Sequence, residues 1–82
     1  MIDVEYKGNL KILVGKTHES FCVGTIEELL RAIKKEYCKE IYTEIKRSHV
    51  MINGTFAQKK FFKKCQLKEN DYVVFFSVCC GG

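Results

Sequence analysis

The stretch Tyr72-Val73-Val74-Phe75-Phe76-Ser77-Val78 decides the fold, because it is apolar at nearly every position. A strand with one solvated face alternates apolar and polar residues, whereas a strand that is apolar on both faces lies inside a sheet or presents one face to a partner. We therefore expect a central strand here. If Val73 and Phe75 point into the core, alternation turns Val74 and Phe76 outward. The opposite assignment, with Phe76 buried and Phe75 exposed, has the same period.

Shorter segments upstream carry further strand signals. Residues 2–6 alternate apolar and acidic side chains, and residues 17–23 hold apolar residues at strand spacing, so we expect two antiparallel neighbours. Residues 10–14 between them fit either a short helical turn or the start of a strand. Asn53-Gly54, flanked by β-prone residues 50–57, predicts a hairpin because both turn residues tolerate positive φ.

One helix is predicted in the middle of the chain. Thr25-Ile26-Glu27-Glu28 has the form of a capping box. Apolar residues follow it at helical spacing, namely Ile26, Leu29, Leu30, Ile33 and Tyr37. A second short helix, or an extension of the first, is expected over residues 39–46. The order of elements predicts an α+β fold with a mixed four- to five-stranded sheet and one main helix packed across it.

The 82 residues fit a single domain, 1–82, with residues 77–82 as its tail. If the first and last strands pair in parallel at the centre, the C-terminus leaves the sheet from its middle. We then expect a free, flexible tail that ends in Gly81-Gly82.

Composition limits the classes of function. The net charge of +4 is weaker than the basic stripe of a dedicated nucleic-acid binder. No apolar run is long enough to span a bilayer, and the acidic start of the chain does not have the form of a secretory leader. Five cysteines, an odd number, favour reduced thiols and a cytoplasmic location. The adjacent Cys79-Cys80 lacks the spacing of a metal site, so no metal is expected.

The terminal Gly81-Gly82 has a chemical interpretation and a plain one. Two glycines form a slender strip that can enter a narrow channel, and they leave the last carbonyl unhindered for activation and attack. Against this, such a pair occurs by chance at a given place in roughly one chain in 200. The pair alone would therefore be interpreted as a frayed end.

Other motifs accompany the pair, and together they resemble the ubiquitin-like β-grasp sulfur carriers of the MoaD and ThiS group. The shared order is an asparagine hairpin, a leucine, an acidic turn, an apolar strand and two glycines: Ile52-Asn53-Gly54, Leu67, Glu69-Asn70-Asp71, Val73 to Phe76 and Gly81-Gly82. Leu13-Val14-Gly15 is similar to a Leu-Val-Gly found in many MoaD-type proteins. The length and this connector look more like MoaD than ThiS.

The resemblance implies a carrier with no complete active site of its own. A partner enzyme would use ATP to adenylate the Gly82 carboxylate, which then becomes a thiocarboxylate, with no cofactor bound to the carrier itself. In MoaD-type proteins the thiocarboxylate donates its sulfur to a pterin precursor in molybdopterin (molybdenum cofactor) biosynthesis, inside a larger synthase subunit that receives the tail. The alternatives are a ThiS-like carrier for the thiamin thiazole, a protein modifier conjugated through Gly82, and a plain interaction domain.

The resemblance also suggests a surface for partners. The family binds partners through an apolar sheet face beside the tail, and Phe56 and Phe76 stand where the resemblance places that face. We add Val74 and Cys80 as candidate contact residues. The basic run Lys59 to Lys64 is interpreted as a solvated loop or edge strand, with an acidic patch on a partner as the alternative. Nucleic acid and membrane are not expected partners.

Overall fold

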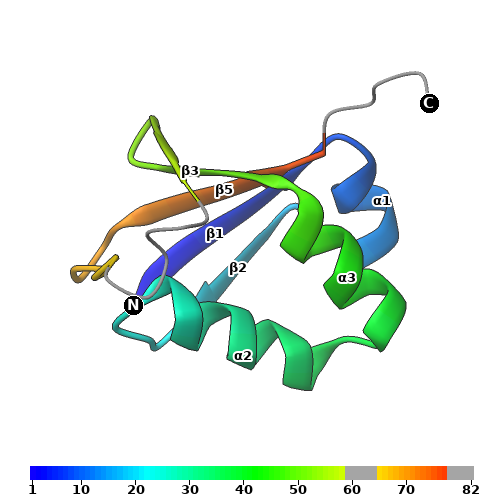
Figure 1. Ribbon diagram of the computed structural model, residues 1–82, viewed down its shortest axis with the longest axis horizontal. Helices are drawn as coiled ribbons and strands as arrows, with labels where there is room; N and C mark the ends of the chain where they lie inside the picture. Colours follow the sequence, from blue (N-terminus) through cyan, green and yellow to red (C-terminus); the bar gives the residue numbers. More distant parts are fainter. Residues whose placement is uncertain (59–64, 78–82) are drawn as a thin grey trace.

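The computed structural model describes residues 1–58 and 65–77 (Figure 1). These residues form a five-stranded sheet and three helices. In chain order the elements are β1 (Ile2–Lys7), α1 (Asn9–Val14), β2 (His18–Phe21), α2 (Ile26–Glu36), α3 (Lys39–Arg47), β3 (His49–Ile52), β4 (Thr55–Ala57) and β5 (Tyr72–Phe76).

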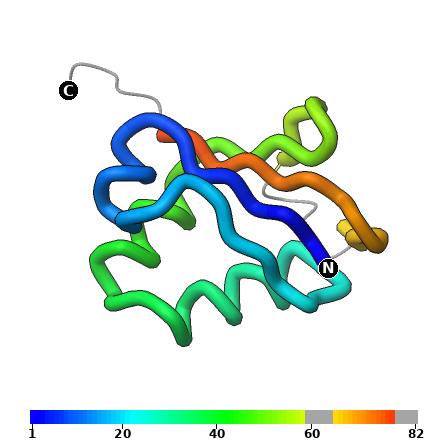
Figure 2. Tube along the Cα trace, turned by 180° about the vertical axis from the view of Figure 1, so that it is seen from behind, coloured from blue at the N-terminus to red at the C-terminus, as the bar shows by residue number. Residues whose placement is uncertain are grey.

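The apolar strand β5 lies in the middle of the sheet, whose order is β2-β1-β5-β3-β4. It runs parallel to β1, with Val4 opposite Val73, and antiparallel to β3, with Val50 opposite Phe75. The first and last strands therefore pair in parallel at the centre, as expected from the sequence. Figure 2 shows the two strands side by side from behind the sheet.

The three helices cover one face of the sheet. The long helix α2 contributes Ile26, Leu29, Leu30 and Ile33 to the core, while α1 adds Leu10 and Val14, and α3 adds Ile45. These side chains pack on the inward residues of β1, β3 and β5, which are Ile2, Val4, Tyr6, Val50, Val73 and Phe75. The expected main helix is therefore α2, and the expectation of a second short helix over residues 39–46 is confirmed by α3.

The local signals account for where the elements begin and turn. The Thr25 hydroxyl accepts a hydrogen bond from the Glu28 N–H at 3.0 Å, so the cap of α2 forms as predicted. Asn53 and Gly54 have φ values of 52° and 86°, which confirms the hairpin between β3 and β4. Asn70 has a φ of 70°, so the turn before β5 also depends on a residue that tolerates the left-handed conformation.

Two ambiguities of the sequence are resolved by packing. Residues 10–14 belong to the helix α1, because Leu10 and Val14 lie one turn apart and both are buried in the core. The second strand is shorter than predicted and covers only His18–Phe21, paired antiparallel with β1.

The Lys59–Lys64 run and Val78 lie outside the described residues. None of the helices in the described ranges is long and apolar enough to cross a bilayer.

Candidate docking face on the outer side of the sheet

Alternation along β5 divides its residues between two faces of the sheet. Val73 and Phe75 are fully buried under the helices. Val74 and Phe76 point to the other face, which none of the helices α1, α2 and α3 covers (Figure 1). Val74 is nevertheless only 9% exposed, although it is not part of the core cluster. Neighbouring side chains on the outer face must therefore cover it.

The register of the strands identifies these neighbours. Met51 of β3 lies opposite Val74 of β5 on one side and opposite Phe56 of β4 on the other. His49 lies opposite Phe76, and on the far side of β5 the partner of Phe76 is Lys7. An apolar surface therefore crosses three adjacent strands. We call it the docking face and define it by its residues His49, Met51, Phe56, Tyr72, Val74 and Phe76.

Three aromatic rings pack together on the docking face. The His49 and Phe76 rings are stacked with their centroids 5.5 Å apart, and Phe56 and Phe76 lie 5.9 Å apart. The Phe56 ring meets His49 edge-on at 6.3 Å and is 63% exposed. Large aromatic side chains that are ordered by one another but open to solvent are typical of protein-binding surfaces.

A shallow hollow of about 450 Å³ lies on the same face. Its lining consists of Lys7, Met51, Gly54, Tyr72, Val74 and Phe76. Lys7 is the one charged residue in this lining and is the last residue of β1, beside Phe76. The hollow can therefore receive an apolar side chain, with a cation at its rim for a carboxylate that accompanies it.

The structure brings some of the predicted site residues together, while others lie outside the described ranges. Phe56, Val74 and Phe76 come together as expected, so the alternative with Phe75 exposed is wrong. His49 was not predicted to be a site residue, so its packing against Phe76 was missed. Its position opposite Phe76 across β3 and β5 could be found only from the strand register. Cys80, Gly81 and Gly82 lie outside the described residues, so their roles stay predictions.

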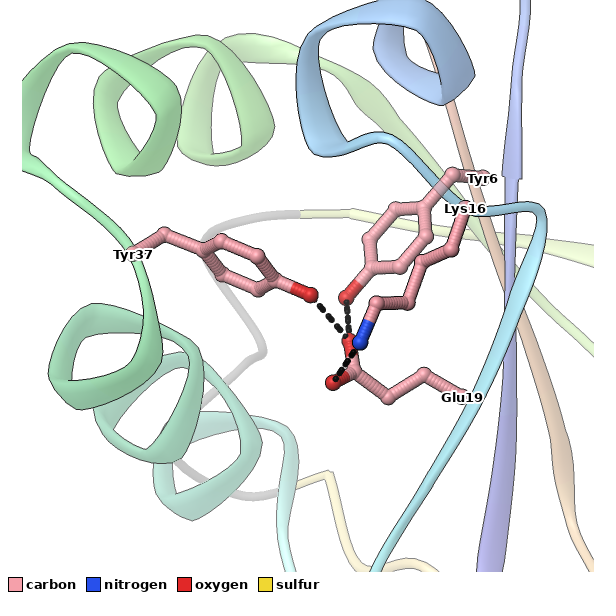
Figure 3. Close-up of polar contacts among 4 residues, drawn as sticks. All are labelled: Tyr6, Lys16, Glu19 and Tyr37. Atoms are coloured by element: carbon pink, nitrogen blue, oxygen red, sulfur yellow. Dashed lines mark hydrogen bonds and ion pairs between the residues drawn. The ribbon is translucent and has the colours of Figure 1, made fainter.

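Apart from the docking face, a cluster of polar side chains surrounds the carboxylate of Glu19 on β2 (Figure 3). The hydroxyls of Tyr6 and Tyr37 donate to Glu19 Oε2 at 2.8 and 2.7 Å, and Lys16 Nζ donates to Oε1 at 3.3 Å. Burial and the hydrogen bond to Glu19 raise the pKa of both tyrosines. Since both carboxylate oxygens are occupied, the cluster is suited to joining β1, β2 and the end of α2, and less to acid–base chemistry.

The described part of the chain offers no other centre for chemistry. Within residues 1–58 and 65–77, no three His, Cys, Asp or Glu side chains are grouped to hold a metal ion. Cys22, Cys38 and Cys65 are free thiols. The docking face is therefore the candidate site, and what it can do is bind a protein surface.

Comparison with known proteins agrees with the architecture. The family model described as ThiS family matches residues 4–82. Among solved structures, the chain is similar to one in the protein–protein complex of subunits 1 and 2 of molybdopterin-converting factor from Helicobacter pylori 26695. The TM-score is 0.71 over 99% of this chain and 97% of that chain, at 20% sequence identity. No curated protein sequence matches. The ubiquitin-like β-grasp fold expected from the sequence is thereby confirmed.

Proposed function

Because this chain belongs to the ThiS family of small sulfur carriers, we propose that it carries sulfur on the C-terminal carboxylate of Gly82. The observation that carries the proposal is the extent of the family match, which includes Gly81 and Gly82 as well as the folded domain. The docking face supports it, because a carrier must be bound by each enzyme that loads or unloads it.

The proposed chemistry explains the two terminal glycines. A carboxylate is a poor electrophile, so a partner enzyme first joins Gly82 to AMP, releasing pyrophosphate from ATP. A persulfide sulfur then displaces AMP, and reduction of the resulting disulfide by a thiol leaves a thiocarboxylate. Adenylation and the displacement of AMP both occur at the carboxyl group of residue 82, where a side chain would crowd the attacking atom. The chain itself supplies the acyl group and the binding surface, while the partner supplies the catalytic groups.

The docking face is proposed to hold these partners. Phe76 belongs to the docking face and is also the last residue of β5, directly before the segment that leads to Gly82. A partner that covers Phe56 and Phe76 is therefore held next to the start of the tail. Aromatic anchors at the centre of an interface supply much of its affinity. The partners are an ATP-dependent adenylating enzyme and a larger subunit that accepts the sulfur.

For the acceptor we propose molybdopterin synthesis, in which this chain would be the small subunit of a synthase. The support is the structural neighbour, whose description names two subunits of molybdopterin-converting factor. A thiamin-thiazole carrier is the second candidate, favoured by the name of the matching family. Purified acceptor enzymes of the two pathways distinguish them, because only the correct one consumes the thiocarboxylate form.

The central test is intact mass spectrometry after incubation with host extract, ATP and a sulfur source. We expect a species in which one oxygen is replaced by sulfur, located at Gly82 by fragmentation. Two variants serve as controls: deletion of Gly82, and addition of one alanine after Gly82, which keeps every residue but moves the carboxylate. Both should fold and neither should gain sulfur. A ladder of heavier conjugates would indicate a protein modifier, and an unchanged mass in active extract would contradict the proposal.

A further inference from the structure

The loop between β1 and α1 closes on the first residue of the tail. Lys7 and Phe76 form the last pair of the parallel β1–β5 ladder, so Gly8 and Ser77 lie side by side where the two strands end. A Cβ built on Gly8 would lie 3.2 Å from Ser77 Oγ and 3.4 Å from the Ser77 carbonyl oxygen. The first distance is tighter than most contacts of a Cβ atom, and the second is at the lower limit of ordinary van der Waals contact, so a methyl group at residue 8 would press against Ser77.

The backbone of Gly8 adds a second restriction. Its φ of 66° and ψ of −141° belong to a region that is essentially open to glycine alone. Two other glycines with positive φ provide a comparison. Gly15 and Gly54 have φ values of 83° and 86°, and a Cβ added at either would have no atom within 4 Å. A Cβ would therefore meet no obstacle at either of them, whereas Gly8 combines the turn with a close contact.

Gly8 is also held firmly on both sides. The ladder with β5 holds β1 before it, and Leu10 and Val14 anchor α1 in the core after it. The Ser77 hydroxyl oxygen is buried against this loop and has no hydrogen-bond partner among the described residues. Burying a hydroxyl without a hydrogen-bond partner lowers the stability of the fold. The burial of the Ser77 hydroxyl therefore indicates that the Gly8 loop packs closely against Ser77.

We propose that Gly8 and Ser77 form a clamp that sets the direction in which the tail leaves the sheet. The proposal rests on the proposed function, because the direction matters only if Gly82 must reach a reaction centre. Five residues separate Ser77 from the carboxylate, a reach of at most roughly 18 Å. Phe76 on the docking face directly precedes the clamp, so the clamp relates the docked partner to the start of the tail. Gly8 is thus a positioning residue.

Gly8→Ala is the first test, with the initial rate of sulfur loading in host extract measured against carrier concentration. Because a small misplacement near a reaction centre can cost up to about 100-fold in rate, we expect the maximal rate to fall about tenfold. The concentration for half-maximal rate should stay unchanged, because the docking face is intact. Gly15→Ala provides the matched control, since it adds an alanine at positive φ without a contact. It should keep the wild-type rate.

Substitutions at Ser77 separate the contact from backbone strain at Gly8. Ser77→Val adds bulk to the same contact while Gly8 keeps its conformation, and it should reproduce the slow loading. Ser77→Ala should load normally, because the hydroxyl has no partner among the described residues. In the double variant Gly8→Ala/Ser77→Gly the hydroxymethyl group is removed, and part of the lost rate should return. Normal loading by both Gly8→Ala and Ser77→Val would overturn the proposal.

A measurement on the isolated protein does not depend on sulfur transfer. Amide ¹⁵N relaxation should give Ser77 the order parameter of rigid backbone, about 0.85, in the wild type. In Gly8→Ala the value should fall below about 0.6, as in flexible backbone. Gly15→Ala should keep the wild-type value. An unchanged order parameter in Gly8→Ala would overturn the clamp even if the protein carries sulfur. If Ser77 loosens as expected but the wild type never gains sulfur, the proposed function is wrong and the positioning role is lost with it.

Discussion

The two faces of the sheet are built from the same strands, but the helices cover only one of them. On the inner face, Val73 and Phe75 are fully buried beneath α1, α2 and α3. On the outer face, Val74 and Phe76 are equally apolar, and no helix of the described residues lies against them. Phe56, beside them, is 63% exposed. A strand that is apolar at every position is thus predicted to have two apolar faces. The pattern does not say which of the two the helices of the same chain cover.

The covered face accounts for stability, and the open face is available for binding. A small domain buries a limited fraction of its surface, so leaving aromatic residues outside the core has a cost in stability. Exposed apolar patches on soluble proteins commonly mark interaction sites. The division between the faces can be tested with adjacent residues of one strand, because Phe75 and Phe76 have the same side chain and differ in the face that they occupy.

The largest expected effect is on the covered face. Phe75→Ala should lower the free energy of unfolding by about 3–5 kcal/mol, because it removes a fully buried ring and leaves a cavity. Phe76→Ala should lower it by only about 1 kcal/mol, the scale of its aromatic contacts. Urea denaturation followed by circular dichroism measures both. Equal losses for the two variants would mean that the faces are not divided as described.

The open face should show the reverse ranking in binding. Phe76→Ala and Phe56→Ala should each weaken partner binding by about 2 kcal/mol, roughly 30-fold, as expected for aromatic anchors. The readout is the carrier concentration at half-maximal sulfur loading. Ile12→Ala is a suitable control, because Ile12 is 74% exposed on α1 and away from the sheet face. If Ile12→Ala weakened loading as much as Phe56→Ala, general surface hydrophobicity would explain the effect.

A smaller loss of stability is expected at the polar edge of the covered face. Glu19→Ala leaves the buried Tyr6 hydroxyl without its acceptor, which should lower the free energy of unfolding by about 1–3 kcal/mol. The double variant Tyr6→Phe/Glu19→Ala should recover part of this loss, because it removes the unpaired hydroxyl. Thermal unfolding of the wild type, Glu19→Ala, Tyr6→Phe and the double variant measures the coupling. Strict additivity of the two substitutions would show that the hydrogen bond contributes nothing.

The smallest effect concerns the end of β5 that lies away from the tail. Hydrogen bonds from the Lys68 N–H and the Asn53 side chain lower the pKa of Asp71. A lowered pKa stabilises the fold above the unfolded value of about 3.9, and this contribution disappears as the pH falls through the folded pKa. Asp71→Asn should therefore unfold at a slightly lower temperature than the wild type at neutral pH. The difference should vanish in acid.

Glu36→Gln serves as the control for the acid series, because Glu36 is an exposed carboxyl at the end of α2 that accepts no hydrogen bond among the described residues. Its melting temperature should follow that of the wild type across the pH range. A gap between Asp71→Asn and wild type that persists at pH values well below about 3.9 would show that the charge of Asp71 is not the cause.

The elements that could be predicted are those with local causes. Three features depend on neighbours within a few residues and could therefore be predicted from the sequence: the Thr25 cap, the Asn53-Gly54 hairpin and the helical period of α2. The helix α1 was ambiguous, because the short stretch of residues 10–14, in which four of five residues are apolar, fits a helix or a strand equally well. His49 and the Glu19 cluster were missed, since their partners are distant in sequence and meet only through strand pairing.

The sequence by itself determined a central apolar strand, its flanking turns and a chain that ends in Gly81-Gly82. These follow from side-chain period and backbone preference, which act over short range. Only the tertiary structure decided that Phe75 faces the helices and Phe76 the open side, because both choices have the same period. It also brought Gly8 against Ser77, a contact between residues 69 positions apart that exists only because β1 and β5 run parallel and end together.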